Sequence, residues 1–163
     1  MIPKCTRLAV VLMLVLMLAP GCVLSKTPLL DDRDGVADPD LTGEFTFTFR
    51  SKTETFRVFL KGNKYLLTDQ KDRLTTFASL HRLKDDVMLV QKSLVKGGTA
   101  PEHYEYLILR KTPKGFEVGS EDLCDGTPGG CEAKSRDDLL RILERQLPMF
   151  LADEKRRVAV LRK

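Results

Sequence analysis

The side chains in this sequence that most resemble catalytic groups lie around its first histidine. Ser79 and His81 alternate along one segment, and Gln91 and Ser93 lie opposite them across a predicted hairpin, so all four can share one face of a sheet. A serine nucleophile needs a histidine within hydrogen-bond reach and a carboxylate that orients the second ring nitrogen. The pattern places no carboxylate there. We therefore expect a polar, solvent-facing stripe, and we expect that the protein is not an enzyme.

Cys22 is a second candidate for chemistry, because it follows an amino terminus of a recognisable kind. Lys4 and Arg7 are the only charged residues before Lys26, and residues 8–19 form an unbroken apolar run. As a helix, these 12 residues would span roughly 18 Å, which is short of the ~30 Å hydrocarbon core of a bilayer. The layout therefore predicts a cleavable signal peptide, residues 1–21, rather than a permanent transmembrane helix.

The small residues Ala19, Pro20 and Gly21 stand directly before Cys22, and this stretch resembles the lipobox of bacterial lipoproteins. The resemblance covers residues 1–22 only. It implies cleavage between Gly21 and Cys22 and a diacylglyceryl group on the sulfur of Cys22, with acyl chains such as palmitate. Each buried methylene contributes about 0.8 kcal/mol, so two or three chains would hold the protein to the membrane permanently.

The resemblance also bears on location. In this family an aspartate after the lipidated cysteine often retains the protein in the inner membrane, and here that position is Val23. The implied location is the periplasmic face of the cell outer membrane. The implied partners are the membrane itself, through the acyl chains on Cys22, and the lipoprotein processing and sorting machinery.

Cys124 and Cys131 are the thiols left in the exported chain, because Cys5 leaves with the signal peptide and Cys22 carries lipid. The segment between them, DGTPGG, contains the glycines and the proline that let a chain turn back sharply. We therefore expect a disulfide between Cys124 and Cys131 in the oxidising periplasm. In the chain-entropy model, so short a loop contributes roughly 2 to 2.5 kcal/mol.

Metal sites are the alternative use of these residues. A zinc site would have to combine the two cysteines with His81 and His103, but their spacing matches no compact zinc motif. The segment at 31–40, DDRDGVADPD, is faintly similar to a calcium loop and lacks the glutamate that should follow its glycine. We expect no metal and no cofactor, and we expect His103 to be an ordinary surface residue.

Charge excludes one large class of partner. The chain has 27 basic and 23 acidic side chains, and without Lys4 and Arg7 the balance is 25 to 23. A nearly neutral domain lacks the basic surface that nucleic-acid binding needs. The basic residues at 155–163 are typical of a solvated chain end, although they could touch anionic head groups.

Two regions follow the signal peptide. Residues 22–41 contain five aspartates and little apolar periodicity, so we expect a flexible acidic tether. Its mean reach would be about 20 to 25 Å. Residues 42–163 are expected to form a single β-rich domain.

The elements of this domain are mostly strands. Phe45, Phe47 and Phe49 alternate with threonines, as in a half-buried strand. Further runs rich in β-branched and aromatic residues follow at hairpin spacing, with turns predicted near 61–64, 84–86 and 113–115. A last strand, RRVAVLR, could return to the sheet edge or close it. The fold class is mainly β, an antiparallel meander of about eight strands that forms a curved sheet or a small barrel.

One helix is expected near 136–147, packed on the sheet through a stripe of leucines. Ser135 is placed to cap its start, and Pro148 is placed to end it.

Function follows from this architecture only in outline. The anchor and tether favour a lipid-anchored, non-catalytic binding or assembly module that meets an envelope protein or glycan. The alternative is a carrier of a small apolar ligand within a β-barrel, which needs an interior cavity of roughly 300 Å³ or more. The aromatic residues that could line such a cavity, or fill it as ordinary core, are Phe45, Phe47, Phe49, Phe56, Phe59, Tyr65, Tyr104 and Tyr106.

Overall fold

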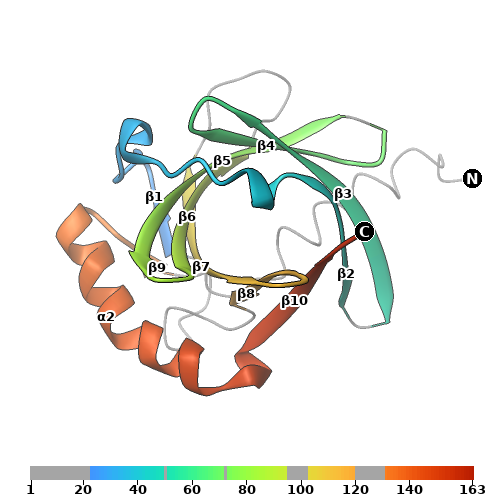
Figure 1. Cartoon of the computed structure of the whole chain (residues 1–163). Coiled ribbons are helices and arrows are strands. Elements are labelled where there is room, and N and C mark those ends of the chain that lie inside the picture. The colour runs from blue at the N-terminus through green and yellow to red at the C-terminus, as the bar shows by residue number, and fades with distance from the viewer. Residues whose placement is uncertain (1–22, 50, 72, 95–102, 120–130) are drawn as a thin grey trace, which may run out of the picture.

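A closed barrel forms the body of the protein. The computed structural model describes residues 23–49, 51–71, 73–94, 103–119 and 131–163. Within this part, eight antiparallel strands close into a ring in the order β6-β5-β4-β3-β2-β10-β8-β7, because β7 also pairs with β6 (Figure 1). Their bounds are β2 (Gly43–Phe49), β3 (Lys52–Lys61), β4 (Lys64–Thr68), β5 (Leu74–Lys84), β6 (Val87–Leu94), β7 (Tyr104–Thr112), β8 (Gly115–Gly119) and β10 (Arg157–Arg162). The predicted meander of about eight strands is confirmed, and of its two forms the barrel is the one observed.

Short hairpins connect consecutive strands where the sequence predicts them. The turns join β3 to β4, β5 to β6 and β7 to β8, and their closing pairs lie at 61/64, 84/87 and 112/115. Gly62 in the first of these turns has a φ of +61°, which glycine adopts without a steric penalty.

β10 closes the ring, so strands from the two ends of the barrel sequence become neighbours. It pairs antiparallel with β8 on one side and with β2 on the other. Gly115 is required at this seam, because a Cβ built on it would lie 2.1 Å from the carbonyl oxygen of Val160. Its φ of +148° also disfavours any other residue.

Two very short strands extend the barrel wall. β1 (Val23–Ser25) pairs antiparallel with the first residues of β7, and β9 (Cys131–Glu132) pairs parallel with β1. β8 pairs with the last residues of β7 only, from Leu109 onward. β1 therefore supplies hydrogen bonds to the part of β7 that β8 does not reach.

The expectation of a flexible tether at 22–41 is wrong for residues 23–41, which we call the docking segment. After β1 it forms two 3-10 turns, η1 (Asp32–Asp34) and η2 (Pro39–Leu41), against the barrel. Val23, Leu30 and Leu41 are its buried apolar residues. Burial of these side chains offsets the conformational entropy that the aspartate-rich segment loses when it is ordered. The folded domain therefore includes residues 23–41 as well as those from 42 onward.

The helix is longer than expected. α2 (Arg136–Ala152) begins as predicted, with the hydroxyl of Ser135 accepting a hydrogen bond from the backbone N–H of Asp138 at 3.2 Å. It does not end at Pro148 but runs through it for one more turn. Phe150 in that turn is buried against the barrel, and its burial offsets the hydrogen bond that proline cannot donate. A short turn, η3 (Glu154–Arg156), leads into β10.

Two apolar cores result. One lies between α2 and the outer wall of the barrel, where Leu139, Leu143 and Phe150 meet residues of β1, β6 and β7 (Figure 1). The other fills the barrel interior. Its buried members are Leu41, Phe45, Val58, Tyr65, Ala78, Leu80, Met88, Val90, Leu109, Phe116 and Val160.

Candidate functional site

One end of the barrel is closed by part of the docking segment. η2 and its neighbours cross this end, as the view along the barrel shows (Figure 1). The side chain of Leu41 is buried among the interior residues. The backbone N–H of Val36 donates to the carbonyl oxygen of Leu80 at 2.7 Å, and the N–H of Asp38 donates to the hydroxyl of Tyr65 at 2.6 Å. We call residues 36–41 the plug.

Ion pairs hold the plug in place. Nζ of Lys111 lies 2.8 Å from Asp38 and 2.7 Å from Asp40, and these hydrogen bonds raise the pKa of Lys111. Arg162 donates to the backbone carbonyl of Asp40. Burial raises the pKa of Tyr65, so this phenol stays neutral and keeps its proton for the plug carbonyls. Lys111 on β7 and Arg162 on β10 thus tie the plug to two strands at this end of the barrel.

On several strands, the inward-facing apolar side chains are less buried farther from the plug. Five strands share one pattern. Each has a buried, inward-facing apolar residue, and the residue two positions farther from the plug on the same strand is only half-buried. The five pairs, buried member first, are Phe45 and Phe47, Val58 and Phe56, Tyr65 and Leu67, Leu109 and Leu107, and Phe116 and Val118. We call the half lined by the second members the distal half. Its apolar wall is less completely packed than the plugged half.

Polar side chains also face the distal half. Glu54 alternates with Phe56 and Val58 on β3 and lies opposite Phe47 in the register of β2 and β3. It is half-buried, and burial raises its pKa, although the charge of Lys52 opposes this rise. No hydrogen bond or ion pair of Glu54 occurs within the described part of the chain. Among the described residues its carboxylate therefore accepts no hydrogen bond, and the charge that acts on it is that of Lys52.

The opposite wall carries a buried ion pair. Lys92 alternates with Val90 and Met88, so it points inward, and its Nζ lies 2.6 Å from Oε2 of Glu105 on β7. The two side chains are 9% and 11% exposed. Nearby on β5, the hydroxyl of Thr76 is buried without a hydrogen-bond partner within the described residues. Since β6 and β2 are four strands apart in a ring of eight, Lys92 and Phe47 line opposite walls.

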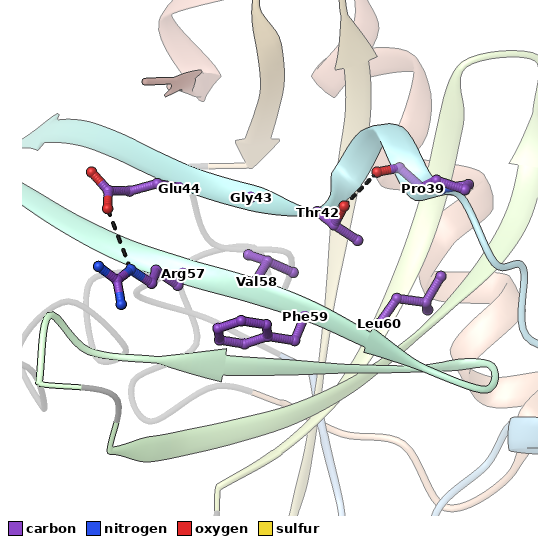
Figure 2. A pocket seen from close by; sticks show the side chains of 8 residues that line it. All are labelled: Pro39, Thr42, Gly43, Glu44, Arg57, Val58, Phe59 and Leu60. Atoms are coloured by element: carbon purple, nitrogen blue, oxygen red, sulfur yellow. Dashed lines mark hydrogen bonds and ion pairs between the residues drawn. The ribbon is translucent and has the colours of Figure 1, made fainter.

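An open groove lies where the plug meets β2 and β3 (Figure 2). Its volume is about 560 Å³, and η2, β2 and β3 line it. Arg57 in this groove is already paired with Glu44 at 3.3 Å, and the hydroxyl of Thr42 donates to the carbonyl oxygen of Pro39. With its polar groups engaged, the groove has few groups left to orient a ligand.

The stripe of Ser79, His81, Gln91 and Ser93 does not face solvent as expected. It lies on the outer wall but is covered, and all of its members except the half-buried His81 are buried. The hydroxyl of Ser79 is 3.2 Å from Nε2 of His81. Burial lowers the pKa of His81, and the charge of Asp32 opposes this effect. Ser79 is only 2% exposed, so a substrate could not reach its hydroxyl.

Asp32 is the carboxylate that the sequence pattern did not place, and it comes from the docking segment. Its oxygens bind Lys64 at 2.6 Å and Gln91 at 3.4 Å rather than the second ring nitrogen of His81. Burial would raise the pKa of Asp32, but hydrogen bonds from Lys64 and Ser79 outweigh burial and lower it. These contacts of Asp32 hold the docking segment against the barrel.

Gln91 holds the same segment through hydrogen bonds to its backbone. Its Oε1 accepts hydrogen bonds from the backbone N–H groups of Leu29 and Leu30, each at 3.0 Å, and from the hydroxyl of Tyr106 at 2.9 Å. Its Nε2 donates to the carbonyl oxygen of Leu30 at 3.0 Å. The hydroxyl of Tyr106 also contacts that of Ser25 at 2.9 Å. One amide side chain thus supplies the backbone hydrogen bonds of a segment that has no strand partner there.

The remaining predicted site residues are mostly outside the described part. Cys22 and Cys124 lie outside it, so lipidation and the disulfide stay predictions. Cys131 is half-buried in β9 beside the α2 core. His103 is half-buried, with Nε2 at 3.3 Å from Glu105, rather than free on the surface. Of the aromatics, Phe59, Tyr104 and Tyr106 lie on the outer wall; the side chain of Phe49 is outside the described part.

The described ranges also bear on metal and membrane sites. There, no three His, Cys, Asp or Glu side chains come close enough together to bind a metal ion. Nor does any helix in those ranges have the length and apolarity to cross a bilayer.

Known proteins add no further constraint to this geometry. No family model matches the chain, and no curated protein or solved structure matches it either.

Proposed function

We propose that the protein is a lipid-anchored envelope binding protein that holds a small apolar ligand in the distal half of its barrel. The observation that supports this is the repeated step from buried to half-buried side chains along five strands. A barrel of eight strands has room either for packed side chains or for one small ligand. The plugged half has packed side chains, and the distal half has an apolar wall that is only half-buried, as a ligand site requires.

A non-catalytic assembly module is the second candidate, and one feature of the outer wall favours it. Phe59, Leu66 and Phe77 are directly opposite one another on β3, β4 and β5 and form an apolar row. Phe59 is 47% exposed. Such a row could contact an envelope protein or glycan, and the ligand experiment below separates the two functions.

A tryptophan introduced inside the barrel tests the carrier function. We expect Leu107→Trp to fill the distal half and to remove any ligand that copurifies with the protein. The matched control is Leu161→Trp, because Leu161 lies on the outer wall and is 46% exposed. Organic extracts of both purified proteins would be compared by mass spectrometry, as moles of ligand per mole of protein.

A clear difference between the two variants supports the carrier. Equal extracts, with or without a bound molecule, contradict a ligand site at Leu107 and leave the assembly module as the better proposal. Partial proteolysis of both proteins shows whether Leu107→Trp is folded, and Leu107→Phe makes the same test with a smaller ring.

The membrane anchor has its own test, which concerns Cys22. Without the sulfur no thioether to diacylglycerol can form, so we expect Cys22→Ala to lack the acyl mass that the wild-type chain carries. We also expect the wild-type protein to begin at Cys22, with residues 1–21 removed. Intact-mass spectrometry of protein extracted from membranes measures both. An unmodified Cys22, or a mature chain that keeps residues 8–19, would contradict the lipoprotein assignment.

A further inference from the structure

We propose that the distal half of the barrel selects apolar ligands whose head group donates hydrogen bonds, and that Glu54 is the residue that makes this selection. The inference rests on the proposed ligand site and adds the chemical class of the ligand. Alcohols, amides and amines belong to this class. Fatty acids, ionised at neutral pH, do not, because a carboxylate only accepts hydrogen bonds.

Glu54 has the position that a head-group partner needs. It faces the interior from β3, directly opposite Phe47 in the register, and both side chains are half-buried. Since no side chain in the described residues hydrogen-bonds or pairs with it, its oxygens remain available. A partly desolvated carboxylate without a partner is costly, and a donor on the ligand would remove that cost.

Lys92, an inward-facing lysine of the distal half, does not offset this preference. Its ammonium group is already 2.6 Å from Glu105, so the pair is neutral as a unit. Lys52 alternates with Glu54 on β3 and attracts its carboxylate, but Lys52 is exposed, so solvent screens its charge more than that of the half-buried Glu54. A carboxylate on the ligand would therefore meet repulsion, and an ammonium would meet attraction.

Three probes with the same chain and different head groups test the proposal: decylamine, 1-decanol and decanoate. Binding to the full-length, membrane-extracted protein in a non-ionic amphipol would be measured by equilibrium dialysis at neutral pH. We expect decylamine and decanol to bind at least tenfold more tightly than decanoate. The exported chain is nearly neutral overall, so its net charge cannot produce this order.

Two substitutions test whether Glu54 causes this preference between the probes. Glu54→Gln supplies both a donor and an acceptor, so the preference should fall to less than threefold. Glu54→Lys should reverse it in favour of decanoate, and this inversion cannot result from simple loss of folding. Glu144→Gln is the matched control, because Glu144 is exposed on α2 and should leave the tenfold preference unchanged.

The outcomes separate this inference from the function on which it rests. Binding of all three probes with equal affinity, or a preference that persists in both Glu54 variants, overturns the role of Glu54 and leaves the carrier intact. No binding of any probe to the wild-type protein, together with equal extracts from the two tryptophan variants, overturns both.

Discussion

Phe45→Ala is expected to lower the free energy of unfolding by about 3 to 5 kcal/mol, the range found when a fully buried phenylalanine is truncated. Phe45 is completely buried inside the barrel. Its ring lies 5.1 Å from that of Phe116 and 6.0 Å from that of Phe56, measured between centroids. The cavity would open in the plugged half, where neighbouring side chains are already packed and cannot collapse into it. Denaturant unfolding followed by circular dichroism measures the loss.

The control for this substitution is a phenylalanine on the adjacent strand. Phe59→Ala removes the same atoms from the outer wall, where the side chain is 47% exposed, so we expect a loss below about 1 kcal/mol. Similar losses for the two variants would mean that Phe45 and Phe59 do not differ in burial as described.

Gln91→Leu is expected to cost about 2 to 4 kcal/mol and to release the docking segment. The substitution keeps the size of the side chain but leaves the N–H and the carbonyl oxygen of Leu30 without partners. An unsatisfied buried polar group costs about 1 to 3 kcal/mol. Hydrogen exchange should show faster exchange at Leu29 and Leu30, with the strands on the far side of the barrel unchanged.

Gln70→Leu serves as the matched substitution, because Gln70 is exposed in a turn and should tolerate the change with little effect. A stable Gln91→Leu protein with protected Leu29 and Leu30 amides would show that burial of the apolar residues alone holds the segment.

Much of the barrel could be predicted because its signals are local. The alternation at Phe45 and Phe47 fixes which face of β2 is apolar, and the short turns fix the order of neighbouring strands. β10 shows the limit of this reasoning. Its alternation identifies a strand, but whether it closes the ring depends on its pairing with β2, which is more than a hundred residues away.

The docking segment could not be predicted because its evidence is not in its own sequence. β1 and β9 have three and two residues, too few for a periodic pattern. The aspartates of this segment suggest a solvated chain, yet Asp38 and Asp40 are bound by Lys111, and Asp32 is bound by Lys64. Each partner lies on a barrel strand, and only the folded barrel brings them together.

The candidate site was predictable in part. The carrier alternative follows from strand count and aromatic content, but which aromatics face inward depends on the register. Lys92 had a usable signal, because it alternates with Met88 and Val90 on an otherwise apolar face. Glu54 had the same signal beside Phe56 and Val58. The burial of the stripe at Ser79 and His81 could not be predicted from its own residues, because the segment that covers it has the composition of a tether.

The burial of Val23 has a consequence for how the protein moves. With acyl chains on Cys22, as the sequence predicts, the residue next to the anchor is already fixed in the barrel wall. One residue extends at most about 3.6 Å, so the barrel has no slack with which to tumble above the lipid surface. It would diffuse laterally with the same side always turned toward the bilayer. Encounters with a partner or a ligand donor would then be two-dimensional, within one leaflet, and would begin from a single orientation.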